Sequence, residues 1–193
     1  MVVLDEFAPN VSGNGYIIYN VHWGASSAQA HSWNQHLYPK AKVTSIVVKA
    51  YKVGNPTGYL KCRIASHVGI YGTSSKPDED LETSTNSKNI ATLSSISAKP
   101  TTVTFTFVGS AEISKDTPYT FYVYADSGSL DGSNYAVVIG DVSHDGNRAY
   151  PSGVEGTWIS SSNDVTFTVN GEEIVTAKPK KFIGDGLVGF VME

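Results

Sequence analysis

The densest group of oxygen donors in the sequence is an acidic run near its middle. Pro77-Asp78-Glu79-Asp80-Leu81-Glu82 carries four carboxylates within six positions. Carboxylate oxygens are the ligands that Ca²⁺ prefers, so Asp78, Asp80 and Glu82 are candidate ligands of a structural calcium ion. The run lacks the spacing of an EF-hand loop. The alternative is that these side chains are solvated or cap their own backbone, as Asp often does in turns.

Aromatic residues in predicted loops point to a second kind of chemistry. Sugar rings stack their C–H faces on Trp and Tyr, while Asn, Asp and Gln bind the hydroxyl groups. Trp23, Tyr71 and Tyr150 lie in or beside such loops and are candidate glycan-binding residues. We expect Trp33 and Trp158, in contrast, to pack in a core.

Catalytic and metal-binding patterns are weak in this chain. His31 and His36 are five residues apart, and an odd separation on a strand places them on opposite faces, which disfavours a shared metal ion. No Gly-x-Ser-x-Gly motif marks a nucleophilic serine, and no glycine-rich phosphate loop precedes a helix. We therefore expect no enzymatic activity.

The scaffold that positions these side chains should consist of β-strands. Residues 102–107 alternate Thr with Val or Phe, and residues 165–169 repeat the alternation. A period of two turns one set of side chains inward and the other outward. Short strands separated by Gly, Asn, Asp and Ser predict an all-β fold, namely a two-sheet antiparallel β-sandwich of the jelly-roll type with a C-terminal extension.

The segment Gly54-Asn55-Pro56-Thr57-Gly58 has the composition of a turn. Pro56 fixes φ, and Gly58 can adopt positive φ at little cost. We expect residues 43–53 and 59–65 to pair as neighbouring strands across this turn. Residues 69–88 are polar and predict a long loop.

Several motifs occur in a fixed order along the chain. They are Gln35, Val53-Gly54-Asn55-Pro56-Thr57-Gly58, Val103-Thr104-Phe105-Thr106-Phe107, Thr117-Pro118-Tyr119, Asn134-Tyr135, and then Gly153, Trp158, Asp164 and Phe167. From about residue 33 to 170, this order resembles choice-of-anchor R domains and their carbohydrate-binding-module-like relatives. The resemblance implies a jelly-roll fold on extracellular or virion surfaces, without defining a ligand. The chain departs from that family at Asp116-Thr117, where Gly-Thr is usual, and in lacking a surface-anchoring segment.

The C-terminal segment is apolar, whereas a free tail should be polar. Lys178-Pro179-Lys180-Lys181 predicts a linker. The apolar residues after it are Phe182, Ile183, Leu187, Val188, Phe190 and Val191. We expect an arm that adds to a neighbouring subunit's sheet edge, and the alternative is a last strand of the same domain. The expected organisation is an N-terminal segment with the first strand at 1–30, the sandwich at 31–171, and a linker with the arm at 172–193.

Composition limits the partners that the chain can have. A net charge of −4 with 14 basic residues argues against a nucleic-acid surface, which needs clustered positive charge. Cys62 is alone, so no intrachain disulfide can form, and we expect it to be a buried small apolar residue. The N-terminus does not have the pattern of a signal peptide, and no apolar run reaches membrane-spanning length.

Together these features predict a non-catalytic structural subunit of a larger assembly, most simply a virion protein that decorates a capsid or is associated with a tail. A virus assembles its exterior in the cytoplasm, which would reconcile a surface module with the lack of an export signal. The expected partners are further subunits in a homo-oligomer and surface glycans, without nucleic acid or membrane. We expect no cofactor apart from the calcium ion considered above. The alternative is a carbohydrate-binding or adhesion module of an extracellular protein.

Overall fold

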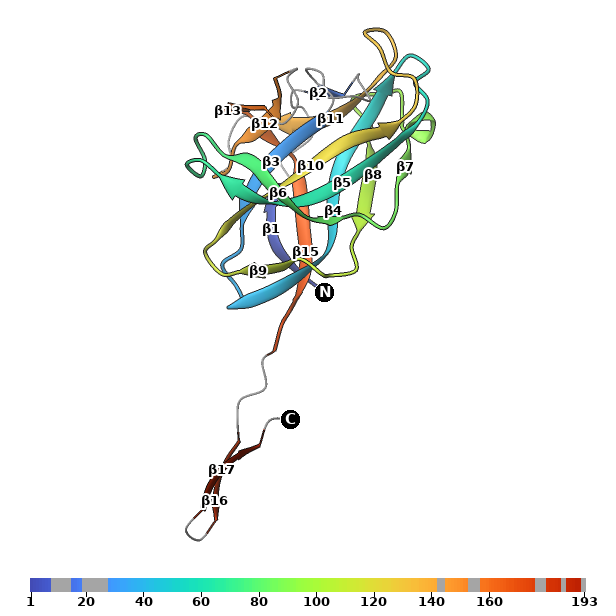
Figure 1. The fold of residues 1–193 in the computed structure, drawn as a ribbon. Coiled ribbons are helices and arrows are strands. Elements are labelled where there is room, and N and C mark those ends of the chain that lie inside the picture. The colour runs from blue at the N-terminus through green and yellow to red at the C-terminus, as the bar shows by residue number, and fades with distance from the viewer. Residues whose placement is uncertain are drawn as a thin grey trace.

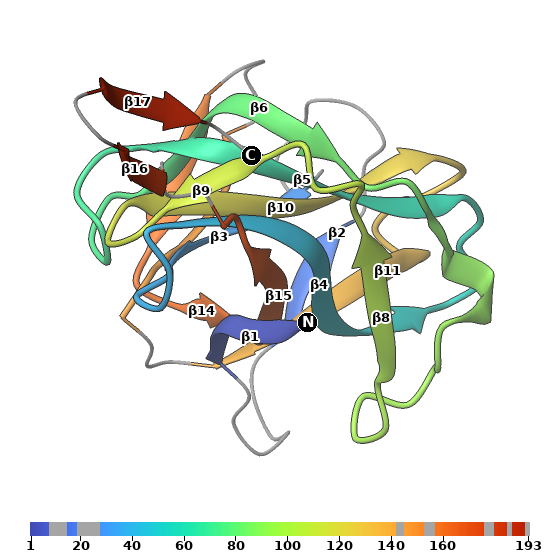
Figure 2. The same ribbon diagram turned by 90° about the horizontal axis from the view of Figure 1, so that it is seen from below.

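A computed structural model describes residues 1–7, 15–18, 28–141, 145–152, 157–175, 180–184 and 187–191, the last two ranges by their backbone alone. Over these residues the chain forms antiparallel strands, together with one short 3₁₀ turn, η1 (Ile90–Thr92). The strands build two large sheets that pack face to face (Figures 1 and 2). The predicted all-β sandwich is therefore confirmed. No helix among the described residues is long and apolar enough to cross a membrane.

Sheet I has eight strands within the described residues. They are β1 (Val2–Phe7), β2 (Gly15–Ile18), β4 (Lys40–Val53), β8 (Thr101–Thr106), β9 (Glu112–Ser114), β11 (Tyr135–Asp141), β14 (Asp164–Val165) and β15 (Phe167–Glu173). The main order is β1-β15-β4-β11-β14, while β2 pairs with β11, and β8 and β9 pair with β4. The 14-residue β4 organises the sheet, because it pairs with four other strands along its length.

Sheet II has seven strands within the described residues. They are β3 (Ala28–Asn34), β5 (Tyr59–Val68), β6 (Lys76–Thr83), β7 (Lys88–Asn89), β10 (Pro118–Ser127), β12 (Arg148–Pro151) and β13 (Trp158–Ser161). The order is β13-β12-β3-β10-β5-β6, and β7 pairs with β5. The chain passes from one sheet to the other between β3 and β4, between β4 and β5, and between β10 and β11. Such alternation is typical of jelly rolls.

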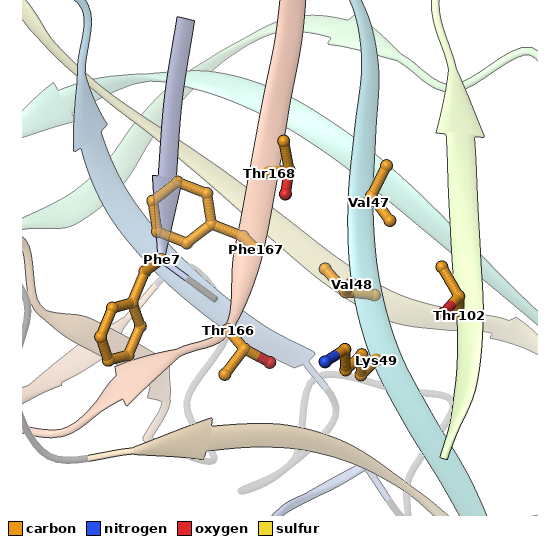
Figure 3. A pocket seen from close by; sticks show the side chains of 8 residues that line it. All are labelled: Phe7, Val47, Val48, Lys49, Thr102, Thr166, Phe167 and Thr168. Atoms are coloured by element: carbon orange, nitrogen blue, oxygen red, sulfur yellow. The ribbon is translucent and has the colours of Figure 1, made fainter. Parts of the chain in front are cut away.

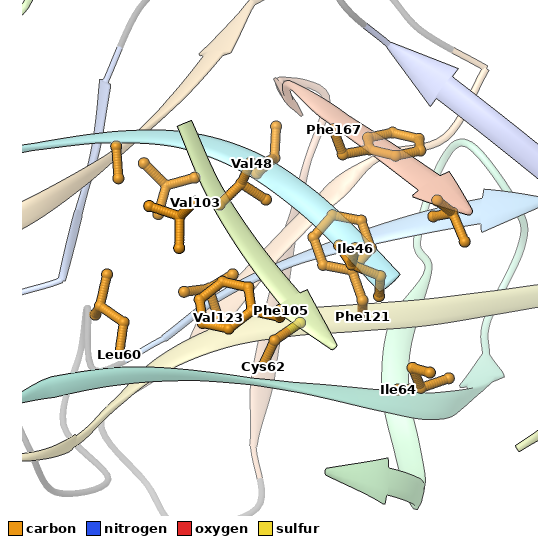
Figure 4. Packing of buried hydrophobic residues seen from close by; sticks show 14 of the residues in the cluster. Ile46, Val48, Leu60, Cys62, Ile64, Val103, Phe105, Phe121, Val123 and Phe167 are labelled. Carbon is orange, nitrogen blue, oxygen red and sulfur yellow. The ribbon is translucent and has the colours of Figure 1, made fainter. Parts of the chain in front are cut away.

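One apolar core fills the space between the two sheets. Phe105 of β8 and Phe167 of β15 meet Phe121 of β10 and Cys62 of β5 in a single cluster (Figure 4). Phe105 and Cys62 are fully buried, which confirms the inward assignment of the alternating strands and the burial of the cysteine. Burial raises the pKa of the Cys62 thiol. Each large side chain buried here contributes about 1.5–3 kcal/mol.

The alternation fails at one residue between β14 and β15. Thr166 was predicted to point outward with its neighbours, but it is buried. Its backbone N–H and its Oγ1 hydroxyl both donate to the carbonyl oxygen of Ile139, at 2.9 and 3.0 Å. Thr166 thus binds the short interruption between β14 and β15 to β11. The alternation of polar and apolar residues in the sequence cannot show that a strand is interrupted.

The segment at residues 54–58 is a crossover between the sheets. β4 lies in sheet I and β5 in sheet II, so the prediction that residues 43–53 and 59–65 pair as neighbours is wrong. The composition identified the turn, because Gly58 has a φ of 106° as expected. It could not identify the partner strands, since two apolar strands that face one core look alike whether they share a sheet or oppose each other.

Residues 69–88 also differ from their prediction as a long loop. They contain β6, which pairs with β5, and the start of β7. β6 contains Pro77 and several charged residues, so its sequence lacks the alternation of polar and apolar residues that predicts a strand. Such residues are compatible with an edge strand, where one side makes no ladder.

Candidate functional site

The C-terminal arm forms a β-hairpin of its own. β16 (Lys180–Gly184) pairs with β17 (Leu187–Val191), so that Ile183 lies opposite Val188 and Lys181 opposite Phe190. The two strands make a separate two-stranded sheet that pairs with neither sheet of the sandwich. Figure 1 shows this C-terminal hairpin beyond the end of β15, clear of the sandwich. The alternative of a last strand within the sandwich is therefore not the arrangement found.

A hairpin of this kind is rarely stable alone. Two strands in water are marginally stable, and a third strand or a packing surface is normally needed. The apolar residues of the arm, Phe182, Ile183, Leu187, Val188, Phe190 and Val191, lie within these two strands. The hairpin therefore has the composition of a segment that binds another protein surface.

The residues predicted to bind glycans lie in separate environments. Trp23 is outside the described residues. Tyr71 is half-buried in the turn between β5 and β6, with its ring 6.3 Å from that of His67. Burial raises the pKa of the Tyr71 phenol, and the carboxylates of Asp5, Asp145 and Asp164 add to this rise.

Tyr150 is half-buried on β12, where its ring is already stacked. The guanidinium carbon of Arg148 is 4.8 Å from the centre of the Tyr150 ring and 3.9 Å from that of Tyr16. Burial lowers the pKa of Arg148, whereas the two tyrosines act in the opposite direction. A sugar that stacked on this face of Tyr150 would have to displace the arginine.

The three residues predicted to bind calcium have different partners along β6. Glu82 is buried, and its two carboxylate oxygens accept the backbone N–H groups of Val108, Gly109 and Ala111. Asp78 is exposed and accepts a long hydrogen bond from Ser66, at 3.5 Å. Within the described part of the chain, no three His, Cys, Asp or Glu side chains converge as metal ligands.

Asp80 belongs to a cluster on the outer face of sheet II that the sequence analysis missed. It accepts hydrogen bonds from Arg63 and from the Tyr122 hydroxyl, the latter at 2.6 Å. The guanidinium carbon of Arg63 is 4.9 Å from the ring centre of Tyr124, and the Trp158 ring lies edge-on to Tyr122 at 5.3 Å. The period-two placement of Tyr122 and Tyr124 on β10 was the available signal.

Small side chains make room for this aromatic cluster. Ala28, Ala30, Ala65 and Ala149 are buried around Tyr122 and Trp158. Burial raises the pKa of the Tyr122 phenol, and its hydrogen bond to Asp80 raises it further. For Arg63, burial alone would lower the pKa, but the two tyrosines and Asp80 raise it overall. The cluster thus holds a cation beside aromatic rings on a surface of the sandwich.

A buried His–Asp pair was also missed. His31 Nε2 is 2.9 Å from Asp164 Oδ1 with both side chains buried, and the imidazole packs 4.9 Å from the Phe167 ring. His36 is exposed and pairs instead with Asp116, at 2.6 Å. The two histidines therefore occupy unrelated environments. Spacing in the sequence relates His31 only to nearby residues such as His36, and it cannot identify a partner 133 residues away.

A hollow in sheet I lies where β4 changes its partner (Figure 3). β15 pairs with β4 as far as Val48, and β11 pairs with it from Ala50, which leaves Lys49 between the two ladders. The lining residues are Phe7, Val47, Val48, Lys49, Thr102, Thr166, Phe167 and Thr168. Lys49 is the single charged group among them, so this lining lacks the acid–base pairs of a catalytic cleft.

Comparisons with models of protein families, with curated proteins and with solved structures give no match for this chain. The similarity to choice-of-anchor R domains therefore remains a prediction that is based on the order of the motifs.

Proposed function

We propose that this protein is a non-catalytic structural subunit that assembles with other copies through its C-terminal hairpin. The observation that carries the proposal is that, among the strands that the structure describes, β16 and β17 pair only with each other. Because an isolated two-stranded sheet is marginal in water, the hairpin needs a protein surface outside its own ladder. The order of motifs in the sandwich supports a virion or extracellular surface as the setting, with a capsid-decorating or tail-associated protein as the preferred form.

The partners of the charged groups support a structural role. Glu82 fastens the loop after β8, and Asp80 is engaged by Arg63 and Tyr122. Asp164 pairs with His31 inside the core. These charged groups hold strands and loops together through hydrogen bonds and ion pairs. A catalytic acid or base, in contrast, must be able to reach a substrate.

The test is to delete residues 178–193 and measure the mass in solution. The full chain should form an oligomer of defined size, and the truncated chain should be a monomer with the same far-UV circular dichroism and a cooperative unfolding transition. An oligomer that survives the deletion would refute the proposal. A truncated chain that does not fold would show that the hairpin is part of the sandwich.

A carbohydrate-binding role is the second candidate, and the Arg63 cluster on sheet II favours it. Tyr124 is half-buried beside Arg63, which pairs with Asp80. A sugar would stack on the ring face that Arg63 leaves uncovered, and its hydroxyls would use the donors and acceptors that remain on the partly exposed ion pair. Binding should be weak for one copy and stronger for an assembly. A glycan array probed with the oligomer should give signals that the Tyr124→Ala variant loses. An array without any signal, beside a lectin that responds, would exclude this role.

A further inference from the structure

Apolar side chains are exposed at the end of the sandwich where β15 ends. Among the described residues, the three most exposed large apolar side chains are Met1, Val175 and Val108, at 81%, 79% and 74%. Leu37 is 52% exposed. Exposed apolar groups that gather in one region of a soluble protein mark interaction surfaces more often than scattered ones do.

Strand pairing and loop contacts place these residues at one end. Val2 lies opposite Gly171 of β15, and the N–H of Ile174 donates to the carbonyl of Lys40 at the start of β4. Leu37 belongs to the turn that enters β4. Val108 precedes Gly109, which lies against the Lys42 side chain. Figure 2 views this end, with the N-terminus near its centre. We call Met1, Leu37, Val108 and Val175 the arm-side patch.

Ion pairs border the patch. Lys40 pairs with Glu112 at 3.1 Å and Lys42 with Glu172 at 3.3 Å, and all four side chains are substantially exposed. Apolar residues with a charged border have the composition of a protein–protein interface, where a polar rim surrounds a dry centre.

The C-terminal hairpin is tethered to the same end. β15 ends at Glu173 and β16 begins at Lys180, so the six intervening residues can span at most about 20 Å. β1 also begins at this end, and among the described strands it pairs with β15 alone.

We propose that the arm-side patch receives the C-terminal hairpin of a second copy of this chain. The inference depends on the proposed function and specifies the surface that the hairpin contacts. The hairpin supplies apolar residues, and the arm-side patch offers an exposed apolar surface for them. A second copy is the occupant because the hairpin pairs with neither sheet of its own chain and lies clear of the sandwich (Figure 1). A reciprocal exchange of hairpins would form a closed two-fold dimer.

Disulfide cross-linking tests which chain provides the hairpin. Cys62 is buried, so an introduced cysteine is the accessible thiol. A chain with Leu37→Cys and one tag is mixed with a chain carrying Val188→Cys and another tag, then mildly oxidised. We expect a disulfide-linked dimer that contains both tags. Ile96→Cys is the matched control, because Ile96 is 55% exposed in the loop beside Lys52 at the opposite end of β4.

Each outcome of the cross-linking decides between hypotheses. A disulfide within one chain, formed by the double variant Leu37→Cys/Val188→Cys at high dilution, would show that the hairpin covers its own sandwich. An intact oligomer without any cross-link would refute this surface and leave the proposed function standing. Chains that remain monomeric without any substitution would refute both.

A second measurement does not depend on disulfide geometry. Leu37→Ser and Val108→Ser alter exposed side chains, so the sandwich should stay folded. Each should weaken the dissociation constant of the oligomer by about tenfold or more, as expected for a central interface side chain. Ile96→Ser should leave it unchanged. Equal effects of the three substitutions would exclude the arm-side patch as the contact.

Discussion

β15 and β17 are both short strands near the C-terminus, yet their surroundings differ. β15 pairs on one side with β1 and on the other with β4, and its Phe167 and Val169 are buried in the core between the sheets. Within the described part of the chain, β17 pairs with β16 alone. Strand propensity is thus present in both regions, and β15 is covered by the second sheet of the sandwich, whereas β17 belongs to a sheet of two strands.

The comparison shows where the stability of this protein resides. The sandwich buries a continuous core from both sheets, so its strands should unfold together in one cooperative step. The hairpin is a separate sheet of two strands, so its stability should depend on what it binds. Substitutions in the two regions should therefore affect different quantities: the free energy of unfolding in the sandwich, and the oligomeric state in the hairpin.

The largest loss of stability should follow truncation in the core. Phe105 is fully buried on β8 among residues of both sheets. Phe105→Ala should lower the free energy of unfolding by about 3–5 kcal/mol, measured by urea denaturation. Ile96→Ala, exposed in the loop at the opposite end of β4, should cost less than about 0.5 kcal/mol. A loss below about 1 kcal/mol for Phe105→Ala would disprove the core assignment.

A side chain at Gly58 should be nearly as damaging, because this residue lies where two backbone segments meet. Gly58 has a φ of 106°, and a Cβ there would lie 1.8 Å from the carbonyl oxygen of Ser127. Gly58→Ala should cost about 1–3 kcal/mol or more. Asn tolerates the left-handed region of φ and ψ. Its Cβ would meet the same carbonyl oxygen, however, so Gly58→Asn should lower the free energy of unfolding at least as much as Gly58→Ala.

Gly132 provides the control for Gly58. A Cβ there would have no neighbour within 4 Å, so Gly132→Ala should leave the free energy of unfolding unchanged or slightly higher. Equal losses at the two glycines would mean that the crossover between β4 and β5 is looser than its geometry indicates.

Glu82 provides a smaller test within the sandwich. Its carboxylate accepts three backbone N–H groups from the loop between β8 and β9. Glu82→Gln keeps the shape but loses the charge, which should cost about 1–2 kcal/mol, since hydrogen bonds to charged groups are the stronger ones. Glu79→Gln, an exposed neighbour, should change little.

A comparison of the wild type with Glu82→Gln also tests the calcium prediction. If Asp78, Asp80 and Glu82 bind Ca²⁺, added Ca²⁺ should raise the melting temperature of the wild type and should do so less for Glu82→Gln. If Glu82 is engaged with the loop alone, added Ca²⁺ should leave both melting temperatures unchanged.

The sequence predicted local features of the sandwich better than its pairing. The alternation in residues 102–107 correctly gave an inward Phe105, and the turn composition correctly gave positive φ at Gly58. The same reasoning assigned the strands on either side of that turn to one sheet. Periodicity reports which face of a strand is buried, and it carries no information about which strand lies beside it.

The candidate sites were predicted less well, for a related reason. The contacts of Asp80 with Arg63 and Tyr122, and of His31 with Asp164, join residues that are far apart in the chain. Composition indicated that acidic residues were available, but it could not show that the fold had already paired them. The arm is predicted from a local signal, namely apolar residues after a basic linker, and the structure forms a separate hairpin there.

The smallest expected effect is a pH dependence at His67. His67 Nε2 is 2.8 Å from Ser75 Oγ, and the imidazole is half-buried near Tyr71. Burial lowers the pKa of His67 from its usual 6.5. The imidazole therefore becomes protonated at a higher pH in the unfolded chain than in the folded chain. The stability that the neutral imidazole gives the folded chain is fully present above pH 6.5 and is lost as the pH falls below that value.

We expect the free energy of unfolding of the wild type to fall between pH 7.5 and pH 5.5 by more than that of His67→Gln, which has no group that titrates there. The difference should be small because solvent still reaches the imidazole. Urea denaturation of both proteins at the two pH values measures it. The truncated chain that lacks residues 178–193 should show the same difference, since His67 lies in the sandwich. Equal slopes in wild type and variant would mean that burial does not disfavour the imidazolium form, and a difference that disappears on truncation would link His67 to the hairpin.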